Sequence, residues 1–205
     1  MVPDLLRDDV FRLETRRLWL RWPRAADAAL IASLAGERDV AETTAHIPHP
    51  FPPGAAAEFV LKARAANMGG GELVLALTPK ARPSEIIGAI ALRQSGERRA
   101  ALDFWLGKPF WSQGYVSEAA RALIDMAFSY TDLAEIRASV RQDHAAAHGA
   151  LEACGFQAAG PGVETAPARG GMIPVERFAL LRSQRAPDVL NMAGRDLVPP
   201  QMQTA

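Results

Sequence analysis

The segment Trp111-Ser112-Gln113-Gly114-Tyr115-Val116 combines residue types that suit an anion-binding turn. A strand-like run ends just before it and a long amphipathic run begins at Tyr115, so Gly114 would lie at the start of a helix. The first N–H groups of a helix lack partners and point, with the helix dipole, toward one place. Because Gly114 lets the backbone approach a phosphate closely, the sequence predicts a phosphate site here. A single glycine before a helix is also typical of an ordinary tight connection.

The same segment disfavours the common nucleotide-binding classes. It contains no Lys, and the chain has neither Gly-x-x-x-x-Gly-Lys-Ser/Thr nor Gly-x-Gly-x-x-Gly. Backbone amides, rather than an ammonium group, would therefore meet the charge of the anion. A kinase or a nucleotide hydrolase is a poor match to this pattern.

Other reactive side chains give weaker signals. His46 and His49 flank Ile47 and Pro48, but no third ligand lies nearby, so we expect no metal site and expect both to line a substrate site. The single cysteine, Cys154, has no partner for an internal disulfide and no convincing base to activate it. We expect Cys154 to pack in the core of a protein of the reducing cytoplasm.

Bulk composition narrows the possible partners. The chain has 205 residues, 49% of them hydrophobic, which suits one domain with a substantial core. Lys plus Arg and Asp plus Glu each total 23, so no net charge draws the protein to nucleic acid or to an anionic membrane. No run is suited to a signal peptide or a membrane span. We expect a soluble cytoplasmic protein with a small-molecule or peptide-end substrate.

Hydrophobic periodicity predicts the elements that must hold the turn. We expect an α/β fold of the α+β type in one domain over residues 1–185, and a tail over 186–205 that is disordered or docks on a partner subunit. The expected strands are 11–22, 72–78, 86–93, 100–106, 135–141, 156–159 and 177–182, with the second to fourth as an antiparallel meander. The expected helices are 25–34, 55–67, 115–130 and 144–154.

Several strings resemble a known family when they are taken in order. They are Leu-Asp-Phe-Trp-Leu at 102–106, Phe-Trp-Ser-Gln-Gly-Tyr-Val-Ser-Glu-Ala at 110–119 and Leu-Glu-Ala-Cys-Gly-Phe at 151–156. Together they resemble the GNAT superfamily of N-acetyltransferases, most closely the branch that includes the ribosomal-protein alanine N-acetyltransferases. The opening Leu-Glu-Thr-Arg-Arg-Leu at 13–18 and Ile-Pro-His-Pro-Phe at 47–51 are similar to that branch too.

This resemblance implies a twisted mixed sheet of about seven strands with helices on both faces. Its fourth and fifth strands, 100–106 and 135–141, would splay apart and hold the pantetheine arm of acetyl-CoA, the cosubstrate. The implied cofactor-binding residues are Phe104, Trp105, Leu106, Trp111, Ser112, Gln113, Gly114, Tyr115, Val116, Ser117 and His144.

The sequence departs from the family pattern in the helix that follows the fifth strand. The branch shows an Asn there and a Ser three residues later, and this chain has His144 and Ala147 instead. Ala147 has no hydroxyl to reprotonate the departing thiolate, whereas His144 can donate a proton near neutral pH. A helix-capping role for His144 is the alternative. His148, one turn further on, is the next candidate. At the turn itself, Val116 is bulkier than the usual Gly or Ala.

Two carboxylates are candidates for the base that deprotonates the acceptor amine. Asp103 lies on the strand nearest the implied reacting centre, and Glu72 begins a neighbouring strand. Strand alternation places Asp103 and Trp105 on one face, so both meet the cleft or both turn away. A solvated strand carboxylate is the alternative for Asp103. Glu118, in the first turn of its helix, suits stabilisation of the helix end.

The expected function is transfer of an acetyl group from acetyl-CoA to a primary amine, either a protein N-terminal α-amine or a small amine metabolite, by direct transfer in a ternary complex. The alternative is a CoA-binding module with little or no activity, favoured by the loss of the hydroxyl at Ala147. We expect acceptor determinants in the loop 43–53, the helix 55–67 and a mobile loop 161–174. The expected assembly is a monomer or a homodimer.

Overall fold

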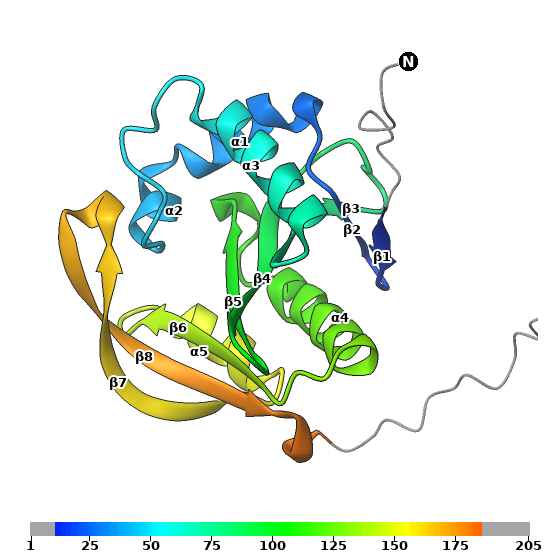
Figure 1. The fold of residues 1–205 in the computed structure, drawn as a ribbon. Coiled ribbons are helices and arrows are strands. Elements are labelled where there is room, and N and C mark those ends of the chain that lie inside the picture. Colours follow the sequence, from blue (N-terminus) through cyan, green and yellow to red (C-terminus); the bar gives the residue numbers. More distant parts are fainter. Residues whose placement is uncertain (1–10, 186–205) are drawn as a thin grey trace, which may run out of the picture.

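The computed structural model describes residues 11–185 and has an eight-stranded mixed sheet at its centre (Figure 1). The strands lie in the order β1-β2-β3-β4-β5-β6-β8-β7. All neighbours are antiparallel except β5 and β6, which are parallel. Their bounds are β1 Arg12–Glu14, β2 Leu18–Arg21, β3 Glu72–Pro79, β4 Gly88–Gly96, β5 Arg99–Leu106, β6 Glu135–Arg141, β7 Gln157–Ala166 and β8 Gly171–Leu181.

Residues 11–185 form five α-helices. They are α1 Ala28–Ala35, α2 Arg38–Glu42, α3 Ala55–Gly69, α4 Tyr115–Tyr130 and α5 Ala145–Glu152. Of these, α1, α3, α4 and α5 pack against the two faces of this sheet. Because side chains alternate along β3, Leu75 and Leu77 pack with α4 on one face, while Ala76 packs with α1 and α3 on the other. α5 adds Ala147 and Leu151 to the α4 side. The expected mixed sheet with helices on both faces is confirmed.

β5 and β6 separate along their length, as the family resemblance implied. Their parallel pairing covers Arg99, Ala100 and Ala101 of β5, with Ala101 opposite Arg137. β5 then continues to Leu106 against β4 alone, and β6 continues to Arg141 against β8. The crossover that joins them contains α4, which a parallel connection requires. The divergence leaves one edge of β5 open to a ligand.

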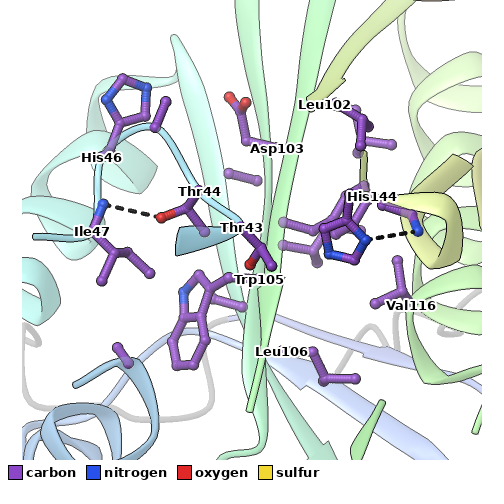
Figure 2. Close-up of a pocket in the computed structure, with 18 of the residues that line it drawn as sticks. Thr43, Thr44, His46, Ile47, Leu102, Asp103, Trp105, Leu106, Val116 and His144 are labelled. Carbon is purple, nitrogen blue, oxygen red and sulfur yellow. Dashed lines mark hydrogen bonds between the residues drawn. The ribbon is translucent and has the colours of Figure 1, made fainter. Parts of the chain in front are cut away.

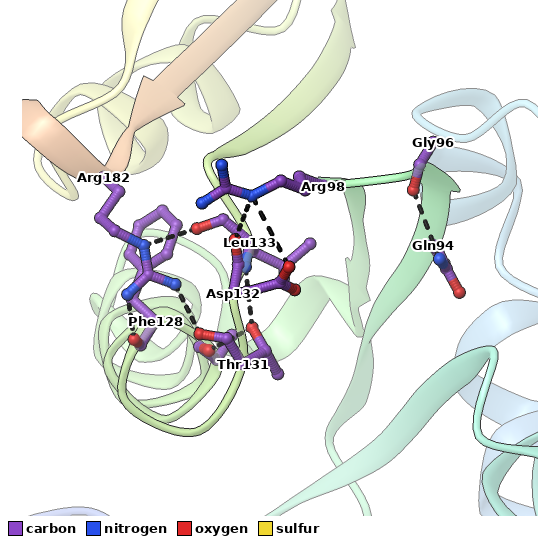
Figure 3. A network of polar contacts seen from close by, with 9 residues as sticks. Gln94, Gly96, Arg98, Phe128, Thr131, Asp132, Leu133 and Arg182 are labelled. Atoms are coloured by element: carbon purple, nitrogen blue, oxygen red, sulfur yellow. Dashed lines mark hydrogen bonds and ion pairs between the residues drawn. The ribbon is translucent and has the colours of Figure 1, made fainter.

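Arg182 and Arg98 bind the backbone next to the end at which β5 and β6 pair (Figure 3). The Arg182 guanidinium donates to the carbonyls of Phe128, Thr131 and Leu133, at the end of α4 and just beyond it. Those carbonyls would otherwise lack partners, and a cation suits the negative end of a helix. Arg98, in the β4–β5 turn, binds the carbonyl and carboxylate of Asp132. The divergence of β5 and β6 therefore begins at an end that these hydrogen bonds hold in place.

The first expected strand, 11–22, is wrong in extent because the chain turns back within it. β1 and β2 form a hairpin in which Thr15 N–H donates to the Leu18 carbonyl at 3.0 Å. The sequence carries a sign of this turn, since the apolar residues that pack against the core change from odd to even positions between Leu13 and Leu18. The short helix α2 was not predicted.

The closing strands are also much longer than expected, and the segment 161–174 is not a loop. β7 and β8 form a long hairpin, whose pairing runs from Gln157 opposite Ala179 to Ala166 opposite Gly171 with a register shift between Ala158 and Gly160. The prolines that suggested a loop lie where strands tolerate them. Pro161 is on the edge strand, and Pro174 lies beyond the last residue that pairs with β6.

The described range ends before the predicted tail, so 186–205 lies outside the described residues. Within residues 11–185, none of the helices has the length and apolar character needed to cross a bilayer.

Candidate active site

A cavity of about 790 Å³ occupies the opening between β5 and β6 and continues to the face covered by α1 and α3. Figure 2 shows that the two sides of β5 divide it. Asp103 and Trp105 point toward the loop that carries Thr43, Thr44 and His46, whereas Leu102 and Leu106 point toward α4 and α5. The two halves suit two substrates.

The predicted phosphate turn forms one end of the cavity. Ser112 has φ 59° and Gly114 has φ 75°, a backbone shape that directs successive N–H groups into one concavity. The Trp111 indole donates to the Leu106 carbonyl at 2.6 Å and fixes the turn to the end of β5. Helix α4 begins at Tyr115, so its first N–H groups face the same region without intrahelical acceptors.

The β1–β2 turn is hydrogen-bonded to this end of α4. Glu118 accepts from the Thr15 hydroxyl at 2.7 Å, and from the backbone N–H and side chain of Arg17 at 2.7 and 2.6 Å. Burial raises the pKa of Glu118, but these hydrogen bonds outweigh it and hold the pKa below its usual range. Arg17 also donates to the Gln113 carbonyl at 3.0 Å and stacks on Tyr115. The expected structural role of Glu118 is what this geometry shows.

His144 is the N-cap of α5 and lines the cavity (Figure 2). Its Nδ1 accepts the Ala147 N–H at 3.3 Å, and burial lowers the pKa of the ring. Because Nδ1 is an acceptor, the neutral imidazole carries its proton on Nε2. His148 points elsewhere, since its Nε2 contacts the Arg141 carbonyl at 2.9 Å and its ring meets Phe178 edge-on. His148 is therefore wrong as a second candidate.

Both predicted carboxylates line the cavity. Asp103 pairs with Arg93 at 3.2 Å, and its side chain is 52% exposed. Glu72 lies opposite Arg93 in the β3–β4 register and is half-buried. Asp103 and Trp105 both meet the cavity, the first of the two expected arrangements. The Arg93 guanidinium beside Asp103 repels a cationic amine, which disfavours the approach of such an amine to this carboxylate.

Glu164 is a cavity residue that sequence reasoning missed. It is half-buried on β7, and its carboxylate accepts a 2.5 Å hydrogen bond from the Ser139 hydroxyl on β6. Both residues line the cavity. Glu164 falls in the segment expected to be a loop, and only the long β7–β8 pairing brings it to β6. The alternation of less exposed positions at 162, 164 and 166 appears only in the structure, because the sequence Gly-Val-Glu-Thr-Ala has its larger apolar residue on the other face.

Of the predicted cofactor-binding residues, Gln113 alone is not part of the cavity lining. Its carbonyl accepts from Arg17, and its side-chain amide donates to the Pro109 carbonyl at 2.8 Å. The others line the cavity: Phe104, Trp105, Leu106, Trp111, Ser112, Gly114, Tyr115, Val116, Ser117 and His144.

The remaining side chains that the sequence analysis singled out are His46, His49 and Cys154. His46 lines the cavity, whereas His49 contacts the Gly36 carbonyl at 3.1 Å. Cys154 is buried, and burial raises the pKa of its thiol, which suits packing. Among residues 11–185, no group of three His, Cys, Asp or Glu side chains is placed to hold a metal ion.

Comparison with known proteins agrees with this architecture. Residues 17–157 match the model of the acetyltransferase (GNAT) domain. An N-acetyltransferase named p20 from Bacillus licheniformis is 31% identical over 104 residues, which cover 50% of this chain and 58% of that protein. The chain thus spans little more than half the length of this curated relative.

Two solved structures show the same fold. A putative ribosomal-protein-serine acetyltransferase from Vibrio cholerae has 19% identity and a TM-score of 0.72, covering 84% of this chain and 98% of its own. A spermidine N-acetyltransferase from Vibrio cholerae, solved with CoA and spermine, has 20% identity and a TM-score of 0.67, covering 82% and 96%. Taken with the domain match over most of the sheet and the splayed strands, these findings show that the chain belongs to the GNAT family of acetyltransferases.

Proposed function

We propose that this protein transfers an acetyl group from acetyl-CoA to a primary amine, directly and within one ternary complex. The observation that carries the proposal is a single cavity that runs from the phosphate turn, along the open edge of β5, to the half lined by Glu164 and the loop 43–48. Such a cavity offers both substrates one meeting point, as proximity catalysis requires.

The cofactor half fits acetyl-CoA in three ways. The turn at 112–116 offers amides to the pyrophosphate. The edge of β5 beyond Ala101 is free of β6 and can pair with the amide groups of the pantetheine arm. A backbone N–H of that edge can also polarise the thioester carbonyl, a contribution of about 3 kcal/mol in comparable sites.

Glu164 is the base we assign to the acceptor amine, in preference to Asp103 and Glu72. The incoming ammonium group must lose a proton before its nitrogen can form the C–N bond. Within residues 11–185, no guanidinium is a hydrogen-bond partner of Glu164, and Ser139 orients its carboxylate. Asp103, in contrast, is held by Arg93. The proton passes to Glu164, directly or through one water molecule.

His144 supplies a hydrogen bond, rather than a proton, to the departing sulfur. Its N-cap bond leaves the proton of the neutral ring on Nε2, which can donate toward a thiolate. Giving that proton away entirely would create an imidazolate, so the thiolate takes its proton from solvent or from the base. Ala147 contributes no hydroxyl to this step.

The acceptor is either a protein N-terminal α-amine or a small polyamine. The relatives named for ribosomal-protein serine and for spermidine support these two classes. The test is release of CoA, measured with a thiol reagent, from acetyl-CoA mixed with peptides that begin with alanine or serine, and separately with spermidine. Mass spectrometry should find one added acetyl group on at least one of them. Absence of product across the panel, despite acetyl-CoA binding, would instead support the inactive CoA-binding module suggested by Ala147.

A further inference from the structure

The tip of the β7–β8 hairpin contacts the loop that forms one wall of the acceptor half. In Figure 1 the hairpin reaches across to α2, although the two are more than a hundred residues apart in the sequence. The loop follows α2 and contributes Thr43, Thr44, Ala45, His46, Ile47 and Pro48 to the cavity. The hairpin contributes Glu164, Ile173 and Val175. Two walls of one cavity therefore meet at this contact.

Arg169 makes most of the contact. Its Nη2 donates to the carbonyls of Ala41 in α2 and of Ile47 in the loop, the latter at 2.7 Å, so one guanidinium nitrogen joins the helix end to the cavity-lining loop. The Nε of Arg169 is buried and has no hydrogen-bond partner among the described residues. An unpartnered donor is costly to bury, so the bonds to the loop must outweigh that cost.

Two further hydrogen bonds reinforce the same joint. The Ala168 N–H donates to the Ala45 carbonyl at 3.3 Å, and Arg141 of β6 donates to the Glu42 carbonyl at 2.7 Å. Carbonyls at 41, 42, 45 and 47 are thus all bound from the β6–β8–β7 side. Two of these carbonyls belong to the end of α2 and two to the loop that follows it, so the helix end and the loop are both held against the strands that bind them.

We propose that Arg169 is a positioning residue for the acceptor, because it fixes the loop wall at 43–48 to the hairpin that carries Glu164. This inference rests on the proposed function. Arg169 itself does not line the cavity, so it acts through the loop and not on the substrate. Its loss should loosen the acceptor half and leave the turn at 112–116 unchanged.

The test compares Arg169→Gln with Arg169→Lys and with Arg177→Gln. Arg177 is an exposed control on the same hairpin, and its contact at 3.5 Å is to Val163 and not to the loop. In steady-state kinetics with spermidine or an alanine peptide, Arg169→Gln should raise the acceptor KM roughly tenfold, while the KM for acetyl-CoA stays within about twofold of the wild-type value. Arg169→Lys should recover part of the loss, and Arg177→Gln should match wild type.

Hydrogen exchange separates this inference from the proposed function, since it needs no acceptor. Peptides covering 41–48 should exchange faster in Arg169→Gln than in wild type or Arg177→Gln, with 112–118 unchanged. Unchanged exchange at 41–48, or an acceptor KM equal to that of wild type, overturns the positioning role. Lack of turnover in the wild-type protein would instead overturn the proposed function, and the exchange result would still decide the role of Arg169 in holding the loop.

Discussion

At the residue scale, the proposed chemistry depends on how neighbours treat three side chains that share one cavity. Asp103 is tied to Arg93, Glu164 is oriented by Ser139, and His144 is committed through Nδ1 to the start of α5. These partners decide the role that we assign to each side chain. Glu164 is assigned as the base and Asp103 is not, and His144 is assigned as a hydrogen-bond donor and not as a general acid.

Replacing Glu164 with Gln tests the base directly. The amide keeps an oxygen that can accept from Ser139, so the structure should persist while the proton acceptor is lost. We expect kcat to fall about 100-fold or more, with the dissociation constant of acetyl-CoA unchanged. Asp103→Asn, measured in parallel, should reduce kcat far less. If Asp103→Asn were the more damaging change, the assignment of the base would be reversed.

The capping role of His144 predicts a pH-dependent stability. Burial lowers the pKa of His144, so the unfolded chain binds the proton more readily and stability must fall as the pH drops below about 6.5. Asn caps a helix well and does not titrate. Urea unfolding should therefore give similar stabilities for wild type and His144→Asn at pH 8, and a growing deficit for wild type toward pH 5.5. Parallel curves would show that the ring is not held neutral by the fold.

Residue-level prediction worked where the signal was local. The turn around Gly114 and the capping alternative for His144 follow from a few adjacent residues. Glu164 could not be found in this way, because its meeting with Ser139 depends on strand pairing between distant segments.

At the element scale, the start of α4 is held by the β1–β2 turn, and this should govern cofactor affinity. Arg17 binds both Glu118 and the Gln113 carbonyl, which keeps that carbonyl away from the phosphate site. Arg17→Gln should weaken acetyl-CoA binding about tenfold in calorimetric titration, an effect equal to about 1.4 kcal/mol. The neighbouring exposed Arg16→Gln is the matched control and should bind normally. Equal acetyl-CoA affinities for all three proteins would show that the β1–β2 turn does not govern cofactor binding.

The Arg182 cluster predicts a purely structural effect at the opposite end of α4 (Figure 3). Arg182→Ala leaves the carbonyls of Phe128, Thr131 and Leu133 without their donor. We expect a loss of about 2–3 kcal/mol in the free energy of unfolding, measured with urea. Arg182→Lys should restore part of it. A variant as stable as wild type would mean that water replaces the guanidinium at no cost.

Periodicity predicted most elements, and its failures have physical causes. The helix at 115–130 and the strand at 135–141 agree with α4 and β6, because each has one clearly apolar face. The β1–β2 turn was missed because apolar and polar residues alternate on both sides of it, and the pattern shifts by only one residue between Leu13 and Leu18. The β7–β8 hairpin was hidden by prolines, which an edge strand accommodates.

At the scale of the whole molecule, the cavity draws on elements from α1 to β8. The family resemblance anticipated the separation of β5 and β6, since it concerns the order of motifs over most of the chain. The hydrogen bonds of Arg169 to the Ala41 and Ile47 carbonyls could not be predicted from the sequence, because they join segments more than a hundred residues apart that share no local pattern.

If the turn at 112–116 and the open edge of β5 bind acetyl-CoA, as we propose, this ligand must stabilise the folded protein, and thermal unfolding with and without acetyl-CoA measures that effect. At one hundred times the dissociation constant, a ligand that binds only the folded state adds about 2.7 kcal/mol. For a domain of this size we expect a rise in Tm of roughly 5–10 °C with acetyl-CoA and a much smaller one with ATP. No rise with saturating acetyl-CoA, or an equal rise with ATP, would contradict it.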